Sequence, residues 1–306
     1  MGRYLACGLL GGLLLGGCGL FLGTDDLSFD ETQSDDTAVT SVSNSTQASG
    51  ANGGSPGTGG APATGGTGGT PERGGLINSG LLARYHLDEA ATGTPPINAE
   101  DVAPAPLPLG LRYDGIMSWA EIDGIRALDY STAGVQGDAF ANVAATSNKL
   151  WLLHGLTHAT VEAVVDVAEV GATGSAIVFI GTDLSGSGEF GLFIPDAAHV
   201  SMVLGAAGGG NFDVPITTLE RVVLHGVLDG STVTLYVDGS PATPVSTTAV
   251  PVDLGVSTHF MLGNTRTYTN TMRGRIYYAA LYTAALTPDE LAHNAQLLSV
   301  SDDTPQ

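Results

Sequence analysis

Two Asp-Gly pairs constrain the fold of this chain more than any other feature of its sequence. Asp229-Gly230 and Asp238-Gly239 separate runs of alternating apolar and polar residues within residues 221–241. Because successive side chains of a strand point to opposite faces, this alternation predicts strands. Asp-Gly tolerates the positive φ angles that tight hairpin turns require. The segment therefore predicts three consecutive antiparallel strands.

Alternation also marks residues 81–88, where positions 81, 83, 85 and 87 are apolar or aromatic. Arg84, His86 and Asp88 occupy the other face, which predicts a half-buried strand. Further strands are predicted at residues 126–130, 159–167, 176–180, 190–194 and 200–204. Short strands separated by turn residues are typical of a β-sandwich.

One helix is predicted near the end of the chain. Thr287 is a suitable N-cap, Pro288 suits the first helical position, and Glu290 completes a capping box. A short helix is therefore expected to run from here to about Leu298.

The first residues predict a signal peptide, because Arg3 precedes a Gly/Leu run that is too short to span a bilayer. The run ends in Leu15-Gly16-Gly17-Cys18, which resembles the bacterial lipobox. That resemblance implies cleavage of residues 1–17 and a lipid on the thiol of Cys18. The alternative is an ordinary secretory signal with an unrelated cysteine.

Composition divides the rest of the chain into a tether and a head. Residues 18–75, the lipidated N-terminus and a stretch rich in Gly, Ser and Thr, are expected to be disordered. Residues 76–300 are expected to form one domain, and 301–306 a tail. The protein is thus predicted to be lipid-anchored in a bacterial cell envelope, at the outer membrane or cell surface, and to contact the membrane through its anchor alone.

Charge and cysteine content exclude several functions. The formal net charge is −21 and the one lysine is Lys149, so no basic stripe for nucleic acid is expected. Of the two cysteines, Cys7 would be removed with the signal and Cys18 would carry lipid. A disulfide, a catalytic thiol and a cysteine-ligated zinc are therefore not expected.

Four segments, residues 80–89, 159–165, 228–239 and 274–291, together resemble the laminin-G-like domains of the concanavalin A-like lectin/glucanase superfamily. The resemblance covers most of residues 78–299 and implies a jelly roll of two antiparallel sheets. The expected fold class is all-β, a two-sheet antiparallel jelly-roll sandwich with one short C-terminal helix. Because the superfamily holds lectins, glycanases, lyases and adhesion modules, no single function follows.

Catalysis is not expected from the sequence. Glycanases of this superfamily carry a Glu-x-Asp-x-(x)-Glu arrangement on one strand, and the nearest match here is the stretch Glu121–Arg126, which lacks the second glutamate. This stretch is predicted to be a loop leading into the strand at residues 126–130. His154 and His158 are four residues apart, but in loop and strand this spacing does not predict a metal site.

Calcium and ligand sites follow from the resemblance. Calcium is the usual ion of the family, and Asp88 and Asp101 are the candidate ligands, although both could instead satisfy backbone groups of turns. Relatives often carry an acidic residue where this chain has Tyr277, which weakens such a site. Trp119 is the candidate for ligand binding at the rim, whereas Trp151, flanked by leucines, is interpreted as a core residue.

The main functional hypothesis is a non-catalytic surface lipoprotein that binds a glycan or an extracellular protein. One alternative is a divergent polysaccharide-degrading enzyme of the same superfamily. A structural component of the envelope is the other.

Overall fold

A computed structural model gives the fold of the head. It describes residues 75–89, 96–112, 118–122, 124–130, 138–171, 174–182, 188–205, 211–215, 220–242, 245–246, 250–266 and 270–301. The predicted signal peptide, Cys18, almost all of the tether, and the tail beyond residue 301 lie outside the described residues.

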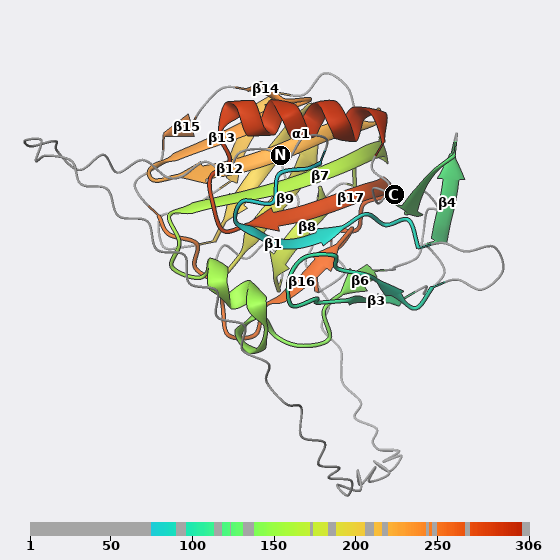
Figure 1. The fold of residues 1–306 in the computed structure, drawn as a ribbon, viewed down its shortest axis with the longest axis horizontal. Helices are drawn as coiled ribbons and strands as arrows, with labels where there is room; N and C mark the ends of the chain where they lie inside the picture. Colours follow the sequence, from blue (N-terminus) through green and yellow to red (C-terminus); the bar gives the residue numbers. More distant parts are fainter. Residues whose placement is uncertain are drawn as a thin grey trace, which may run out of the picture. The chain divides into compact units, whose positions relative to one another are not determined.

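Two antiparallel sheets make up the described head (Figure 1). In sheet A, most strands follow one another along a single main path. Two more strands pair beside this path, β1 with β17 and β15 with β13. The main path of sheet A, in spatial order, is β14 (Ser240–Pro241), β13 (Thr232–Val237), β12 (Val222–Asp229), β7 (His158–Glu169), β17 (Arg273–Tyr282), β5 (Ile125–Asp129) and β4 (Ser118–Ile122); β1 is Leu81–Tyr85 and β15 is Val245–Ser246.

Sheet B contains eight strands among the residues that the structure describes. Their spatial order is β11 (Asn211–Pro215), β10 (His199–Leu204), β9 (Phe190–Asp196), β8 (Ser175–Gly181), β16 (His259–Leu262), β6 (Asp138–Phe140), β3 (Leu109–Arg112) and β2 (Asn98–Ala99). The chain between β6 and β7 forms two short 3-10 helices, η1 (Ala145–Ser147) and η2 (Lys149–Leu153).

The predicted meander is confirmed, since β12, β13 and β14 pair consecutively and antiparallel. At the second turn Asp238 and Gly239 have φ angles of 50° and 74°, as the Asp-Gly rule requires. At the first turn Asp229 is still in β12, so Gly230 and Ser231 form the turn instead. The strand boundary was thus predicted one residue too early.

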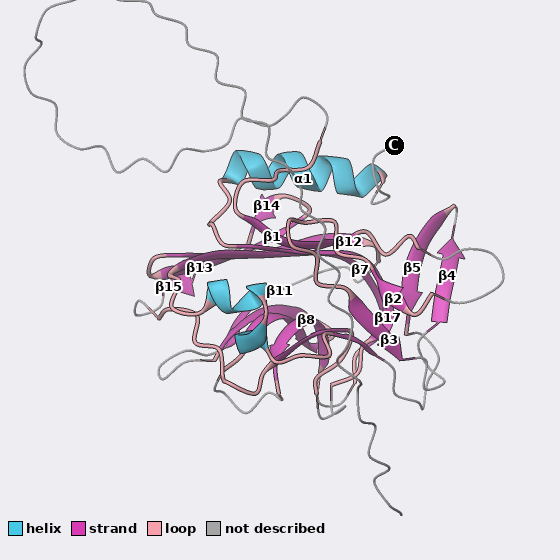
Figure 2. Ribbon diagram, turned by 60° about the horizontal axis from the view of Figure 1, so that its bottom comes forward, coloured by secondary structure: helices cyan, strands magenta, loops and turns pink. Residues whose placement is uncertain are grey.

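The main core lies between the sheets, and a second apolar layer lies between sheet A and the helix α1 (Pro288–Val300). Figure 2 shows α1 along the outer side of sheet A, with sheet B on the opposite side. Leu291, Ala295 and Leu298 of α1 are buried in this layer. The predicted capping box is confirmed, because Thr287 and Glu290 exchange side-chain-to-backbone hydrogen bonds. No helix in the described part of the head is long and apolar enough to cross a membrane.

Two expectations about strands are wrong. β1 is buried on both faces rather than one, because the second layer covers Arg84, which is 6% exposed, and His86, which is 4% exposed. The stretch from Glu121 was predicted to be a loop, but β4 and β5 form a hairpin in which Ile122 pairs with Ile125. The turn of this hairpin holds Gly124, whose φ of 83° explains why glycine occupies it.

Candidate functional site

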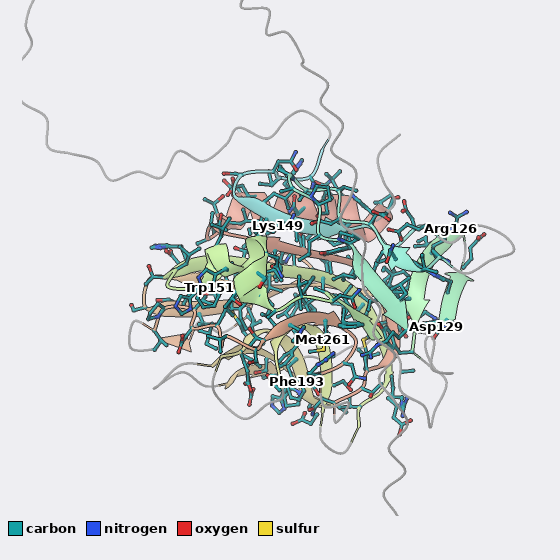
Figure 3. All side chains as sticks on the ribbon, turned by 90° about the horizontal axis from the view of Figure 1, so that it is seen from below. Arg126, Asp129, Lys149, Trp151, Phe193 and Met261 are labelled. Atoms are coloured by element: carbon teal, nitrogen blue, oxygen red, sulfur yellow. The ribbon has the colours of Figure 1, made fainter. Side chains whose placement is uncertain are left out.

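The face of sheet B that points away from sheet A carries its own apolar cluster. Strand alternation sends Phe260 and Ile180 into the main core and leaves Met261 and Phe179 on this outer face. The members of this outer cluster are Phe140, Ala176, Phe179, Phe193, Val203 and Met261. Figure 3 labels two of them, Phe193 and Met261.

Register and glycine positions order this cluster. Phe140, Met261, Phe179, Gly191 and Val203 stand opposite one another across neighbouring strands. Gly181 leaves room for the Phe179 ring, because a Cβ there would lie 2.5 Å from a ring carbon. Gly174 does the same for Phe193, at 2.3 Å. The Phe179 and Phe193 rings therefore lie over these two glycines, along the outer face of sheet B.

Polar side chains gather around the Phe140 end of the cluster. The guanidinium carbon of Arg112, on β3, lies 4.1 Å from the Phe140 ring centroid, and that of Arg266, just after β16, lies 5.5 Å from it. The exposed amide of Asn142 lies against Gly110, the register partner of Phe140, with Nδ2 3.5 Å from a Cβ placed there. We call Arg112, Phe140, Asn142, His259 and Arg266 the Phe140 patch.

His259, on β16, adds an imidazole to this patch. Burial lowers the pKa of His259, and the positive charge of Arg266 lowers it further. The imidazole is therefore neutral at neutral pH, so one ring nitrogen can accept a hydrogen bond while the other donates.

The chemistry of the patch is that of a binding surface. The Phe140 ring is only 9% exposed and lies under the two guanidinium groups, so contact with a ligand would come from the guanidinium, amide and imidazole groups, which form directed hydrogen bonds. Ligand sites combine apolar side chains with a few placed polar groups in this manner. Arg112, His259 and Arg266 are half-buried, and Nδ1 of His259 is buried.

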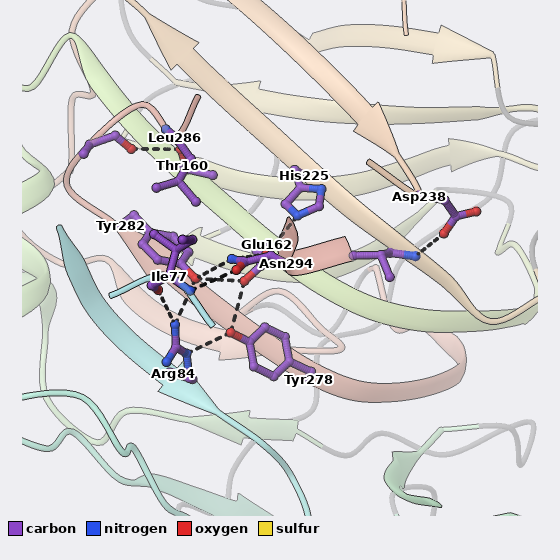
Figure 4. Close-up of polar contacts among 12 residues, drawn as sticks. Ile77, Arg84, Thr160, Glu162, His225, Asp238, Tyr278, Tyr282, Leu286 and Asn294 are labelled. Atoms are coloured by element: carbon purple, nitrogen blue, oxygen red, sulfur yellow. Dashed lines mark hydrogen bonds and ion pairs between the residues drawn. The ribbon is translucent and has the colours of Figure 1, made fainter. Parts of the chain in front are cut away.

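A separate polar network lies between sheet A and α1 (Figure 4). The Glu162 carboxylate, fully buried on β7, accepts hydrogen bonds from His225 (2.8 Å), Asn294 (3.0 Å), Tyr278 (3.0 Å) and Tyr282 (2.9 Å). Burial alone would raise the pKa of Glu162, but the interactions with His225, Asn294 and Tyr282 outweigh it and lower that pKa.

Arg84 completes the network from β1. Its guanidinium donates to the hydroxyl oxygens of Tyr278 (2.9 Å) and Tyr282 (3.2 Å), which donate in turn to Glu162. A buried cation and a buried anion are thus bridged by two hydroxyl groups. Because the network is enclosed, it stabilises the fold and offers no surface to a ligand.

A laminin-G family model, described as the concanavalin A-like lectin/glucanases superfamily, matches residues 136–292. The chain belongs to this superfamily. A search of curated protein sequences found no match to this superfamily member.

Solved structures are similar to this lectin/glucanase-superfamily chain at low identity. Trypanosoma rangeli sialidase matches at a TM-score of 0.51 and 18% identity over 72% of this chain, which spans only 33% of the sialidase. CBM40 of the Ruminococcus gnavus IT-sialidase, bound to α2,3-sialyllactose, matches at 0.40 and 20% over 45% of this chain and 82% of its own. Domain 4 of AbnA, a GH43 arabinanase from Geobacillus stearothermophilus in complex with arabinotriose, matches at 0.45 and 18% over 71% and 98%. At 18% identity the likeness to the sialidase concerns the fold alone.

Asp101, one of the two predicted calcium ligands, does not have the surroundings that a metal ligand needs. Its Oδ1 accepts from the backbone N–H of Arg84 (3.0 Å) and Ala103 (2.9 Å), and its Oδ2 accepts from that of Leu107 (2.9 Å). The Lys149 ammonium lies 2.5 Å from Oδ2. Both oxygens of this buried carboxylate therefore face donors, where a cation would be repelled.

Asp88 lies beside another cation, because its backbone carbonyl accepts from Arg126 at 2.7 Å. Among the residues that the structure describes, no group of three or more His, Cys, Asp or Glu side chains could hold a metal ion. Calcium binding at Asp88 stays a prediction.

The tryptophans lie apart from the Phe140 patch. Trp119 is half-buried on β4 of sheet A and packs against the main core, so its role in ligand binding stays a prediction. Trp151, in η2, packs against the same core and stacks on His154, with ring centroids 4.1 Å apart. His154 accepts from the backbone of Leu254. His158 instead lies 3.2 Å from Asp229, so the two histidines have different partners.

The glycanase-like stretch forms part of the β4–β5 hairpin. Glu121 pairs across the hairpin with Arg126, their charged atoms 3.7 Å apart and both side chains exposed. Figure 3 labels Arg126 and Asp129 on this hairpin. Asp123 lies outside the described residues. The hairpin belongs to sheet A, so Glu121 does not reach the outer face of sheet B.

Sequence reasoning missed the Phe140 patch because its members are spread over residues 112–266. Phe140 stands on a three-residue strand that is too short for alternation to reveal. A signal was available in Gly181 and Gly191, since a glycine within a strand marks close approach of other groups.

Proposed function

We propose that this protein is a non-catalytic surface lipoprotein whose head binds a glycan at the Phe140 patch. The observation that carries this proposal is an aromatic ring surrounded by two guanidinium groups, an amide and a neutral imidazole on one face of the sandwich. Membership of a superfamily of lectins and glucanases supports a carbohydrate as the ligand.

We expect the whole chain to bind glycans on an array, and Phe140→Ala to weaken that binding at least about tenfold, because the buried ring holds the two guanidinium groups in position. Asn142→Ala, at an exposed position that should not affect folding, is expected to weaken binding as well. Thermal unfolding of both variants separates lost contact from lost structure.

Trp119→Ala is the matched comparison, since it removes an aromatic side chain from sheet A. Unchanged binding of this variant would support the Phe140 patch as the site. Loss of binding in Trp119→Ala with full binding in Asn142→Ala and folded Phe140→Ala would contradict it. Recovery of a protein partner with no glycan bound would contradict the glycan proposal altogether.

Non-catalysis is part of the proposal. Glu189 lies on the outer face of sheet B, where its Cγ is 3.1 Å from a Cβ placed on Gly181, and Asp213 is exposed on β11. We expect the bound glycan to release no reducing ends on prolonged incubation. Release that disappears in Glu189→Gln or Asp213→Asn would instead establish a divergent glycanase.

The proposed anchor is Cys18, in a bacterial envelope at the outer membrane or cell surface. We expect cells fed an alkyne fatty acid to label the protein, and Cys18→Ser to abolish the label and move the protein into the soluble fraction. Cys7→Ser is the control, because this cysteine lies within the predicted signal peptide. Membrane attachment of an unlabelled Cys18→Ser variant would contradict the anchor.

A further inference from the structure

We propose that residues 75–78, the first residues of the head that the structure describes, form a strap that opens in acid while the two sheets stay folded. The strap lies where the predicted tether joins the head. Its opening would release the side chain of Ile77, which is buried in the apolar layer between sheet A and α1. The joint between tether and head would then be fixed at neutral pH and loose in acid.

Side chains hold this strap in place. Residues 75–78 precede β1 and belong to no strand. The backbone N–H of Ile77 donates to Oδ1 of Asn294 at 2.9 Å, and its carbonyl accepts from Nη2 of Arg84 at 2.6 Å (Figure 4). Nη1 of Arg84 also donates to the side chain of Asn78, at 2.7 Å. The strap can therefore open without separating any pair of strands.

The two side chains that hold Ile77 are themselves positioned by Glu162. Nδ2 of Asn294 donates to Oε1 of the carboxylate at 3.0 Å. Arg84 reaches Oε2 through the hydroxyl groups of Tyr278 and Tyr282, which accept from the guanidinium and donate to Oε2 at 3.0 and 2.9 Å. One buried carboxylate thus supports both contacts of the strap.

A proton on Glu162 would disturb this arrangement, because each of its oxygens already faces two donors. Oε1 accepts from His225 and Asn294, and Oε2 accepts from Tyr278 and Tyr282. An O–H on either oxygen would displace at least one of these donors. His225 cannot compensate by changing its tautomer, because its buried Nδ1 has no hydrogen-bond partner in the described head and a proton there would be unsatisfied.

Acid also removes the counter-ion of Arg84. Burial alone would lower the pKa of Arg84, but the interactions with Tyr278, Tyr282 and Glu162 raise it, so the guanidinium stays charged. A buried cation without its anion is strongly unfavourable. Exposure to water relieves this cost and takes the guanidinium hydrogen bonds away from the strap.

The pH at which the strap opens follows from the pKa of Glu162. Burial would raise this pKa from its ordinary value of 4.5, but the interactions with His225, Asn294 and Tyr282 lower it. The charge therefore holds the strap closed at and above pH 4.5. This stabilisation is lost as the pH falls from 4.5 through the lower pKa of the folded state.

The other titratable groups of this network are tyrosines and histidines. Burial raises the pKa of Tyr278 and Tyr282, on β17, so both hydroxyl groups stay protonated. The histidines are His225 on β12, His86 just after β1, with its ring centroid 5.5 Å from that of Tyr278, and His293 on α1, whose Nε2 lies 3.0 Å from a strap carbonyl. An opening controlled by a histidine is expected near the ordinary histidine pKa of about 6.5, well above the window of Glu162.

Hydrogen exchange followed by mass spectrometry tests the strap on the whole chain between pH 7 and pH 3, with rates corrected for the intrinsic effect of pH. We expect peptides that cover residues 75–78 to lose at least about tenfold protection below pH 4.5, the effect of losing hydrogen bonds that depend on a charged group. Peptides that cover β8, an interior strand of sheet B, are expected to stay protected.

Variants assign the opening to Glu162. Glu162→Gln is expected to show the exchange of the open strap already at pH 7, with little further change in acid. Glu169→Gln, an exposed change on the same strand, is the matched control and should behave as the wild type does.

A second pair of variants tests the strap if Glu162→Gln does not fold. Asn294→Ala removes the direct partner of Ile77 and should raise strap exchange at least about tenfold at neutral pH. Gln296→Ala, exposed on the same helix, should leave it unchanged. Thermal unfolding shows which variants are folded.

Four results would overturn the inference. Loss of protection in β8 at the same pH as in the strap would show that the whole head unfolds. An opening centred near pH 6.5 would assign the effect to a histidine. A strap that stays protected down to pH 3 would show that no acid opening occurs. An acid opening of folded Glu162→Gln equal to that of the wild type would exclude Glu162 as its cause.

Discussion

Glu162→Gln is expected to lower the free energy of unfolding by about 3–5 kcal/mol, the cost of removing one partner from a buried ionic network. Four donors converge on the Glu162 carboxylate, and a glutamine would present an amide N–H₂ to two of them. The buried guanidinium of Arg84 would also lose its anion. Urea unfolding followed by circular dichroism measures the change.

Glu169→Gln is the matched control, because Glu169 is exposed on the same strand. The pH dependence identifies the charge as the cause. Since the pKa of Glu162 is lowered on folding from an ordinary value of 4.5, its charge stabilises the fold above that pH. The difference between wild type and Glu162→Gln should shrink as the pH falls below 4.5 towards the folded pKa. A difference that stays constant from pH 7 to pH 3 would contradict this account.

Gly191→Ala is expected to cost about 3 kcal/mol, because the new methyl group would meet backbone rather than a movable side chain. A Cβ at Gly191 would lie 2.0 Å from the carbonyl oxygen of Val178 and 3.0 Å from the Cα of Phe179, both on the neighbouring strand β8. Overpacking of a rigid site costs about 1–3 kcal/mol, and the φ of 158° adds backbone strain. Thermal or urea unfolding measures the loss.

Gly230→Ala separates the cost of the steric contact from the cost of the backbone strain. Gly230 also has a positive φ, 63°, but nothing lies within 4 Å of a Cβ placed there. It should therefore cost only about 1 kcal/mol, the price of a positive φ in alanine. Equal losses in both variants would show that the contact with β8 is unimportant.

Local sequence signals predicted the elements whose structure depends only on residues close together in the sequence. Thr287 and Glu290 cap α1 through contacts within one turn, and Asp238-Gly239 forms its turn through two dihedral angles. The same rule applied to Asp123-Gly124 would have predicted the β4–β5 hairpin. Within the Glu-x-Asp pattern the same pair indicates no hairpin, which is why a loop was predicted where β4 and β5 pair.

Contacts between distant segments could not be predicted. Arg84 alternates with apolar residues, which predicts that its side chain is exposed. In the structure it belongs instead to a buried network that includes Asn294, in a helix more than 200 residues later. The Phe140 patch likewise needs the pairing of β3 with β6 and of β6 with β16. Strand pairing over such separations is set by the whole fold, and no local pattern carries it.

The two ends of the head hold each other in place. β1 pairs with β17, the backbone N–H of Ile77 donates to Asn294 at 2.9 Å, and the carbonyl of Gly75 contacts His293 at 3.0 Å. As the chain emerges from its N-terminal end, β1 therefore has no partner until β17 has followed, and Arg84 has no complete set of partners until α1 follows. Sheet A can close only after nearly the whole head has emerged, so this head must fold late and remain unaggregated until then.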